Sequence, residues 1–247
     1  MSGHSKWATI KRAKAKTDAA RGRIFTKIIR EISTAAKVGG GDPAANPRLR
    51  LSIDKAKAAN MPNDNIKRAI EKGLGGGDAV MEELTYEGFG PGGFAILVNV
   101  MTDNRNRAAG EIRNTFDKHG GNLGSSGSVS YLFNRRGSIV LEKAGIDEDK
   151  LTLAAIDAGA EDIISEDKTI EVLTTPENFE KVKNALQSAG FNPVQADIAM
   201  IPTTTVKLTG ETAQKALKLV SLLEEHDDVQ EVFTNFDISE EELEKAG

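Results

Sequence analysis

The spacing of apolar residues changes once along this chain, at the glycine-rich segment 73–78 (GLGGGD). Before this segment, apolar side chains recur at helical intervals in three stretches that are separated by Gly, Asn and Pro. After it, short apolar runs that are typical of β-strands alternate with further helical stretches. This order predicts an α+β protein in which a three-helix N-terminal domain precedes domains of mixed helix and sheet.

The three N-terminal helices are bounded by recognisable start and stop residues. We expect the first helix to begin at Asp18 and to end near residue 38, before three consecutive glycines. Asn46 as cap and Pro47 in the first turn predict the start of the second helix. The third helix is expected over residues 63–72, after the short turn 60–62. The apolar faces of the three helices predict a small bundle.

Residues 79–136 predict two strands, a helix and a third strand. The first two strands are expected over residues 83–88 and 94–101. Asp103 or Asn104 is expected to cap a helix that ends near His119. The Gly- and Ser-rich stretch 120–127 predicts a flexible loop, and residues 129–133 predict the third strand.

Residues 137–201 predict the order βαββαβ, the ferredoxin-like split βαβ arrangement. The strands are expected at 138–141, 160–165, 169–173 and 194–200, and the helices at 147–158 and at 176–189 with Thr175 as cap. The rest of the chain predicts a strand at 204–208, a helix at 211–226 and a strand at 229–235.

These last elements would complete the unit that begins after the linker, so we expect three domains. The domains are a basic helical domain over 1–78, a discontinuous α/β domain over 79–136 plus 202–247, and a ferredoxin-like domain over 137–201 that is inserted into it.

Positive charge is concentrated in the first third of the chain. Residues 1–77 contain 17 Lys and Arg against six Asp and Glu, a net charge of +11, whereas the whole chain carries −5 and the remainder therefore −16. Such asymmetry predicts that a polyanion binds at one end of the molecule while the acidic remainder repels it. The acidic α/β domains are in turn a candidate surface for a protein partner.

The first 30 residues are the main candidate for phosphate contacts. They hold nine Lys and Arg and one acid, Asp18, so local salt bridges can neutralise little of the charge. Residues 2–16 have no sustained apolar face and predict a mobile basic arm. Trp7 offers a ring on which an unpaired base could stack, although it could equally be a core anchor. A solvated charged face is the competing interpretation of the whole segment. The predicted nucleic-acid-binding residues here are Lys6, Trp7, Lys11, Arg12, Lys14, Lys16, Arg21 and Arg23.

The second and third helices, joined by a short turn, could form a helix-turn-helix. The third helix would then present Asn63, Asn65, Lys67 and Arg68, whose side chains are of the types that read base edges in a major groove. Helix pairs with short turns also occur in bundles that bind no DNA. We add Lys67 and Arg68 to the predicted nucleic-acid-binding residues.

Arg105 and Arg107 lie in the first turn of the helix expected after residue 104, where the helix dipole disfavours cations. Free N–H groups together with guanidinium groups could form a site for a phosphate or a carboxylate. The alternative of equal weight is a pair of salt bridges to the acidic remainder. Arg105 and Arg107 are therefore a candidate anion site.

The sequence predicts no catalytic site, cofactor or bound metal, and hence a non-enzymatic protein. The chain has no cysteine, and its histidines, His4, His119 and His226, lie far apart without a metal-binding spacing. Neither glycine run follows a strand or carries a nucleotide-binding pattern. No segment predicts a signal peptide or a membrane span, so we expect a cytoplasmic location without membrane contact.

Two long motifs resemble those of the YebC family. Residues 3–73 read GHSKWATIKRAKAKTDAARGRIFTKIIREISTAAKVGGGDPAANPRLRLSIDKAKAANMPNDNIKRAIEKG. The second motif consists of residues 86–93, YEGFGPGG, and residues 101–133, MTDNRNRAAGEIRNTFDKHGGNLGSSGSVSYLF. The resemblance runs nearly from end to end. It implies an α-helical first domain followed by two ferredoxin-like α/β domains that enclose a cleft.

Members of the YebC family are commonly regarded as probable DNA-binding transcriptional regulators. Others are translation factors that help the ribosome through stretches such as consecutive prolines, and the mitochondrial members are translational activators of cytochrome oxidase. The resemblance thus implies a nucleic-acid-binding regulator of gene expression, whose partner is DNA or else ribosomal RNA and the ribosome. A DNA-binding transcriptional regulator is our first hypothesis, a ribosome-associated translation factor the second, and an anion-binding sensor or enzyme the third.

Overall fold

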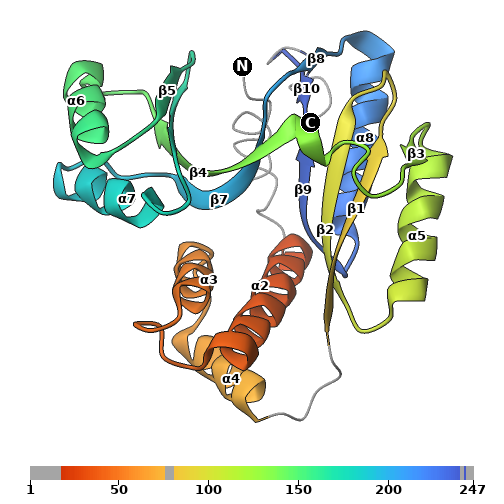
Figure 1. The fold of residues 1–247 in the computed structure, drawn as a ribbon, viewed down its shortest axis with the longest axis horizontal. Helices are drawn as coiled ribbons and strands as arrows, with labels where there is room; N and C mark the ends of the chain where they lie inside the picture. Colours follow the sequence, from red (N-terminus) through yellow and green to blue (C-terminus); the bar gives the residue numbers. More distant parts are fainter. Residues whose placement is uncertain (1–17, 76–80, 240–241, 243–247) are drawn as a thin grey trace.

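The computed structural model describes residues 18–75, 81–239 and 242 and has three packed units (Figure 1). The first unit, called the helical bundle here, contains α2 (Asp18–Gly39), α3 (Pro47–Ala58) and α4 (Asn63–Leu74). Asn46 caps α3, because its side-chain oxygen accepts the Leu49 N–H at 3.1 Å. The three helices expected from the sequence are confirmed, and they bury a core around Ile32, Leu49 and Ile66.

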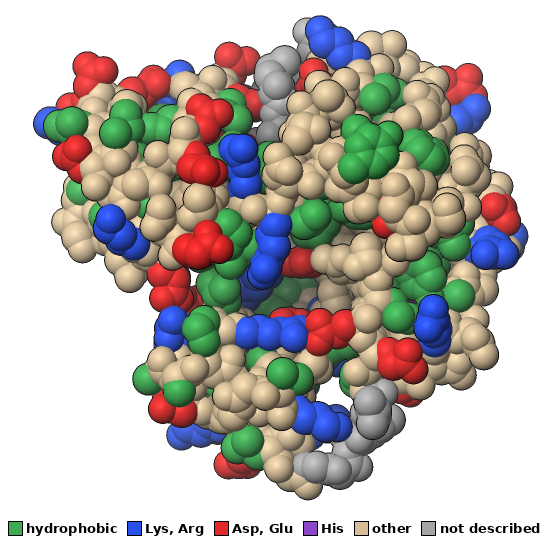
Figure 2. Space-filling view, viewed as in Figure 1, with side chains coloured by type: hydrophobic (Ala, Val, Ile, Leu, Met, Phe, Trp, Pro, Cys, Tyr) green, Lys and Arg blue, Asp and Glu red, His purple; other side chains and the backbone are tan. Residues whose placement is uncertain are grey.

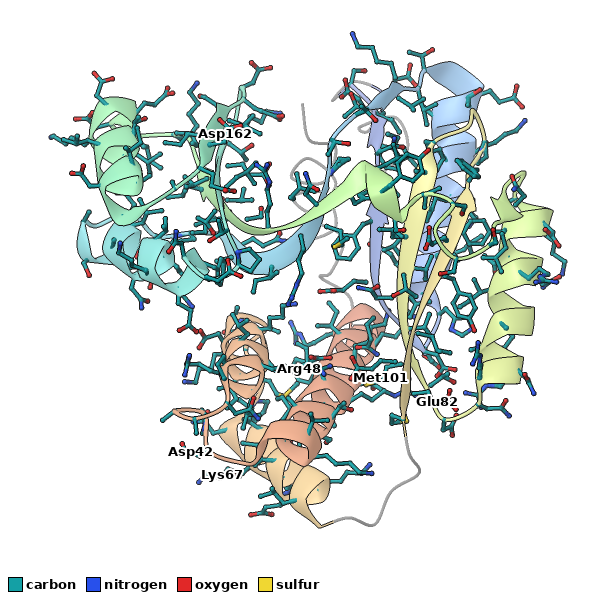
Figure 3. All side chains as sticks on the ribbon, viewed as in Figure 1. Asp42, Arg48, Lys67, Glu82, Met101 and Asp162 are labelled. Atoms are coloured by element: carbon teal, nitrogen blue, oxygen red, sulfur yellow. The ribbon has the colours of Figure 1, made fainter. Side chains whose placement is uncertain are left out.

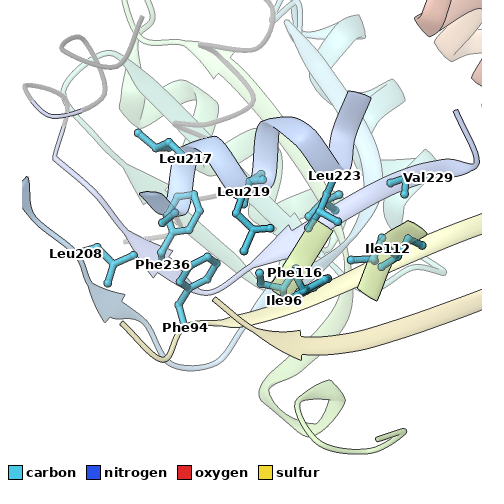
Figure 4. Packing of buried hydrophobic residues seen from close by; sticks show 14 of the residues in the cluster. Phe94, Ile96, Ile112, Phe116, Leu208, Leu217, Leu219, Leu223, Val229 and Phe236 are labelled. Carbon is cyan, nitrogen blue, oxygen red and sulfur yellow. The ribbon is translucent and has the colours of Figure 1, made fainter. Parts of the chain in front are cut away.

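The second unit is built on sheet A, a four-stranded antiparallel sheet with the order β3-β1-β2-β9. Its strands are β1 (Glu82–Phe89), β2 (Ala95–Thr102), β3 (Asn122–Leu123) and β9 (Val229–Thr234). Helices α5 (Arg105–Lys118) and α8 (Gly210–Glu225) pack on one face of this sheet (Figure 4). Phe94 and Phe236 meet in that core edge to face, with ring centroids 5.2 Å apart.

The third unit is built on sheet B and follows the order βαββαβ that the sequence predicts. Its elements are β4 (Phe133–Glu142), α6 (Glu148–Ala158), β5 (Asp162–Ser165), β6 (Thr169–Thr174), α7 (Phe179–Ser188) and β7 (Gln195–Pro202). The strand order is β5-β6-β4-β7, with all neighbours antiparallel, as in a ferredoxin-like unit. The fold is therefore α+β, as expected.

An apolar cluster joins the two α/β units. Ala95 and Leu97 of β2 and Phe233 of β9 belong to the same buried cluster as Phe133 of β4 and Ile201 of β7. Contacts between sheet A and sheet B thus resemble those inside a domain core. The exact bounds of the predicted domains stay a prediction.

Two expectations for the segment between α5 and β4 are wrong, and the carboxylate of Glu87 is the reason for the second. Instead of a flexible loop, residues 120–127 contain β3, which pairs with β1. Glu87 accepts the N–H groups of Gly127, Val129 and Ser130 at 2.7 to 2.8 Å. Because the Val129 and Ser130 N–H groups are used in this way, the expected strand 129–133 is replaced by a 3-10 turn, η1 (Ser130–Leu132), and β4 begins at Phe133.

Two further boundaries differ from the prediction. The strand expected at 204–208 is reduced to β8 (Val206–Lys207), which pairs in parallel with β10 (Phe236–Asp237) outside both main sheets. Helix α7 begins at Phe179 and not at residue 176, because Thr175 Oγ1 accepts the Asn178 N–H and caps a turn that precedes the helix.

Candidate nucleic-acid interface

Helix α4 presents the candidate surface, and close packing on α2 sets its position. Ile66, Ala69 and Gly73 form its buried side. A Cβ atom at Gly73 would lie 2.3 Å from the main-chain carbonyl oxygen of Ser33 on α2, so only glycine permits this approach. The opposite side of α4 is consequently directed away from the core of the bundle.

The turn between α3 and α4 depends on Asn60. With a φ of 57°, Asn60 is the one non-glycine residue with positive φ in the described part of the chain. Asparagine tolerates this left-handed conformation better than most residues. The following residue, Met61, is buried and donates its N–H to the Ala56 carbonyl at 2.9 Å. The turn is thereby anchored to α3, and α4 begins directly after Pro62.

The outward side of α4 carries Lys67 and Arg68, as the sequence predicts for a nucleic-acid contact. Both side chains are exposed, and neither forms an ion pair or hydrogen bond with a residue that the structure describes. Figure 3 shows Lys67 on the outer side of the bundle, away from both α/β units. Asp64 and Glu71 are exposed on the same helix, so this surface mixes both signs of charge.

The other predicted contacts lie at or before the start of α2. Arg21 and Arg23 are exposed in its first two turns and share the bundle with Lys67 and Arg68. Six predicted contacts lie outside the described residues, and their role stays a prediction: Lys6, Trp7, Lys11, Arg12, Lys14 and Lys16.

Most charged side chains of α3 pair with carboxylates or cations of the α/β units, and Lys57 near its end is exposed. Arg50 donates from Nε and Nη2 to the two carboxylate oxygens of Glu180 on α7, at 2.8 and 2.9 Å. In return, Nζ of Lys183 on α7 lies 2.9 Å from Oδ2 of Asp54 on α3. Two ion pairs of opposite direction therefore join α3 to α7.

Two more cations of α3 pair with sheet A. Lys55 Nζ lies 3.0 Å from Glu231 Oε1 on β9, and Arg48 Nη1 lies 2.9 Å from Glu83 Oε1 on β1. Arg48 Nε also donates to Glu31 of α2 at 2.9 Å. Burial lowers the pKa of Lys55, but the hydrogen bond to Glu231 and the charges of Glu231, Asp197 and Glu31 together outweigh this effect and raise the pKa above its ordinary value.

Sequence reasoning missed this cationic row on α3. The apolar positions of the helix determine its buried side, and nothing in its local sequence shows which distant carboxylates its cations meet. The only signal available was the charge asymmetry itself, which places acidic partners in the remainder of the chain.

A cavity of about 810 Å³ lies where the three units meet. Figure 2 shows it as a hollow between the helical bundle, at the bottom of the view, and the α/β units. Its wall carries charges of both signs, with Lys27, Arg48 and Lys55 opposite Glu83 and Glu231. Because α2 and α3 of the bundle form one wall of this hollow, it differs from a cleft enclosed by the two α/β domains alone, which stays a prediction.

The candidate anion site at the start of α5 contains one arginine that is already paired. Arg107 Nη2 lies 2.9 Å from Asp103 Oδ1 and 2.7 Å from Asp228 Oδ2. Asn104 is the cap residue, since its side chain accepts the Arg107 N–H at 3.1 Å. Arg105 is exposed and forms no ion pair with a described residue. The salt-bridge alternative therefore describes Arg107, whereas an anion at Arg105 stays a prediction.

Asp228 connects this corner to the helical bundle. Its side chain is 5% exposed and also accepts from Arg30 of α2 at 3.1 Å and from Thr102 Oγ1 at 2.9 Å. Burial raises the pKa of Asp228, but hydrogen bonds from Arg107 and Thr102 and the charges of both arginines outweigh it and lower the pKa below its usual value. Asp228 is ionised at neutral pH and ties α2 to sheet A.

In the described residues, no group of three or more His, Cys, Asp and Glu side chains is placed to hold a metal ion. No helix among them is long and apolar enough to span a membrane. His226 Nε2 lies 2.9 Å from Glu111 Oε2. This histidine therefore links the end of α8 to α5.

Two family models match the chain. Residues 5–76 match the TACO1/YebC protein N-terminal domain, and residues 81–236 match the TACO1/YebC second and third domain. The second match starts just before β1, so the models change over at the segment where the apolar spacing changes.

Curated relatives and a solved structure agree with this match over almost the full length. A protein of Geotalea uraniireducens named "probable transcriptional regulatory protein" is 58% identical over 246 residues, which is 99% of each chain. A protein of Treponema denticola with the same name is 58% identical over 241 residues, 97% of this chain and 98% of the relative. The crystal structure of a conserved hypothetical protein from Aquifex aeolicus, 49% identical, superposes with a TM-score of 0.82 over 92% of this chain and 94% of that chain.

Proposed function

This chain belongs to the TACO1/YebC family, and on that premise we propose that it is a non-enzymatic, nucleic-acid-binding regulator of gene expression. Relatives that are 58% identical carry the name of probable transcriptional regulators, which supports a regulatory role. More specifically, we propose that the helical bundle contacts the nucleic acid.

The observation that carries the proposal is that some cations of the helical bundle are paired with carboxylates while others are exposed and unpaired. Three cations of α3, Arg48, Arg50 and Lys55, are paired with carboxylates. Lys67 and Arg68 of α4, together with Lys57 near the end of α3, are exposed without a described ion-pair partner. An unpaired guanidinium group and an unpaired ammonium group on a rigid helix can meet phosphates at little reorganisation cost. Phosphate contacts of this kind supply most of the affinity for nucleic acid.

The first form of the proposal is a DNA-binding transcriptional regulator. The α3-turn-α4 pair would then place α4 in a major groove, with Asn63 and Arg68 at the base edges and Lys67 at a phosphate. Specific binding should exceed binding to random duplex by about 10³-fold or more at physiological salt. Equal affinity for random and selected duplexes would argue against this form.

The second form is a ribosome-associated translation factor that binds RNA, with relief of stalling at proline runs as its task. The exposed carboxylates of Asp64 and Glu71 favour this form, because a helix lying along a major groove would bring them close to phosphates. Co-sedimentation with ribosomes and cross-links from the bundle to ribosomal RNA are expected. A protein that stays at the top of the gradient would exclude this form.

A charge-reversal pair tests the common core of both forms. Replacing Lys67→Glu and Arg68→Glu together should weaken binding to DNA or RNA and reduce the slope of log affinity against log salt by about two, one unit for each lost contact. The control is Lys215→Glu with Lys218→Glu on α8, which changes net charge equally on an exposed face of the second unit. If both pairs reduce the slope equally, α4 is not the contact surface.

A further inference from the structure

The helical bundle and the two α/β units are held together by different kinds of contact. The α/β units share a buried apolar cluster that includes Leu97, Phe133 and Phe233. By contrast, the described contacts of α3 with the α/β units consist of ion pairs together with the partly buried Leu51. Helix α3 can therefore move relative to α7 with little loss of apolar burial, while Arg30 of α2 stays paired with the buried Asp228 beside sheet A.

The carboxylates on α3 occupy positions that phosphates could occupy equally well. Glu180 receives both Nε and Nη2 of Arg50, a two-point fork that a phosphodiester can also accept. Arg48 and Lys55 lie on the other flank of the same α3 face, beyond Leu51 and Asp54, and pair with Glu83 and Glu231. Arg48 also keeps Glu31 of α2 as a partner inside the bundle. The carboxylates of the α/β units come from three different elements, β1, α7 and β9, so no single local motif requires them.

We propose that α3 carries a second surface for a phosphodiester chain, and that carboxylates of the α/β units occupy this surface until a nucleic acid displaces them. The surface consists of Arg48, Arg50 and Lys55. The inference rests on the proposed function, since it adds a masked contact to the exposed one on α4. Displacement moves α3 away from α7 and opens the cavity between the three units.

The exposure of the ion pairs makes this exchange feasible. The Arg50 and Glu180 side chains are 34% and 35% exposed, and those of Lys55 and Glu231 are 38% and 37% exposed. Ion pairs as exposed as these are individually weak and are screened by salt. A polyanion offers many phosphates to the same cations at once, which favours exchange over any single carboxylate.

The distance between α3 and α7 reports the exchange directly. Arg50 with Glu180 and Asp54 with Lys183 place the middle of α3 near the first half of α7, and the exposed Ala58 and Gln187 lie one to two turns further along their helices. The chain has no cysteine, so Ala58→Cys with Gln187→Cys gives two unique sites for spin labels without changing charge. Pulsed electron paramagnetic resonance then measures the distance in the full chain.

Salt and nucleic acid should both lengthen this distance. Raising the ionic strength from about 0.1 M to about 1 M shortens the Debye length from roughly 10 Å to roughly 3 Å and should populate a longer distance. Random-sequence single-stranded RNA and duplex DNA of equal length, added separately at low salt, should populate the same longer distance. The arm with the larger change identifies the preferred nucleic acid.

A matched pair of variants distinguishes the effect of the Arg50–Glu180 ion pair from the effect of net charge. In the labelled chain, Glu180→Gln should populate the longer distance without added nucleic acid and bind it about two- to five-fold more tightly, the effect of one exposed ion pair. Glu177→Gln makes the same charge change just before α7, at an exposed residue without a described ion pair, and should change neither.

Binding of RNA or DNA with an unchanged distance overturns the exchange but leaves the proposed function intact. The exchange is also overturned if Glu180→Gln and Glu177→Gln give the same distance between the spin labels and the same affinity for nucleic acid. No binding of either nucleic acid at low salt overturns the proposed function, and the exchange with it.

Discussion

Gly73→Ala is the substitution that tests most directly how α4 is positioned. The added methyl group would lie 2.3 Å from the carbonyl oxygen of Ser33 and 3.0 Å from Cβ of Ala36, both on α2. The first contact is with main-chain oxygen and cannot be relieved by rotating a side chain. Helix α4 must therefore move away from α2, and the outward row that carries Lys67 moves with it.

Two opposing effects determine the magnitude. Alanine in place of glycine stabilises a helix interior by about 0.5–1 kcal/mol. Overpacking of a close contact costs about 1–3 kcal/mol, and the upper end applies here because the atom met is part of the backbone. We expect a net loss of about 2 kcal/mol in the stability of α4 against opening.

Hydrogen exchange measured by mass spectrometry resolves this effect within a protein of several units. Amides of α4 should exchange roughly 30-fold faster, the equivalent of about 2 kcal/mol. The control is Gly110→Ala in α5, where no atom lies within 4 Å of the added Cβ. The same chemical change should there slow exchange by about two- to five-fold, because only the helix propensity gain remains.

Close packing of α4 on α2 requires effects of opposite sign on hydrogen exchange at Gly73 and at Gly110. Unchanged or slower exchange of α4 amides in Gly73→Ala would refute the close approach of α4 to α2. Weaker binding of nucleic acid by Gly73→Ala, with Gly110→Ala unchanged, is the further result expected if α4 is the contact surface.

Two other perturbations concern buried carboxylates. Burial raises the pKa of the Glu87 carboxyl, but three N–H donors outweigh burial and lower this pKa. The stabilisation by Glu87 is therefore complete above the pKa of the unfolded chain and is lost as pH falls through the pKa of the folded protein. Hydrogen exchange of the Gly127 amide should speed up over that pH range, and protection that does not depend on pH would contradict this role of Glu87. Asp228→Asn should destabilise the junction of α2 with sheet A by about 2 kcal/mol, less than a fully buried pair because its arginine partners are partly exposed, and thermal unfolding should show it. The exposed Asp227→Asn is the matched control, and an equal effect there would refute the role of Asp228.

The elements governed by local physics follow from the sequence. The bundle helices appear where the apolar spacing and the cap at Asn46 predict them, and sheet B has the predicted βαββαβ order. The strand expected at 129–133 fails because Glu87, about 40 residues earlier, takes the N–H groups that the ladder would need. No local pattern reveals a hydrogen bond of this range.

Some properties of the candidate site also follow from the sequence, and others depend on the tertiary structure. Exposure of Lys67 and Arg68 is a consequence of helical periodicity, since Ile66, Ala69 and Gly73 occupy the buried side. Composition also indicates that a basic unit and an acidic remainder share one chain. Helical periodicity depends on residues close in sequence, and net charge depends on the count of charged residues, so both can be taken from the sequence alone.

Only the tertiary structure decides which cations remain available. Arg50 of α3 and Arg68 of α4 belong to the same basic segment, yet Arg50 is paired with Glu180, 130 residues away, and Arg68 is exposed. The reason is that electrostatic pairing depends on distance in space, and the packing of the bundle against sheets A and B sets those distances. The sequence determined how much positive charge this protein carries and on which helices, and the packing of the three units determined where that charge is neutralised.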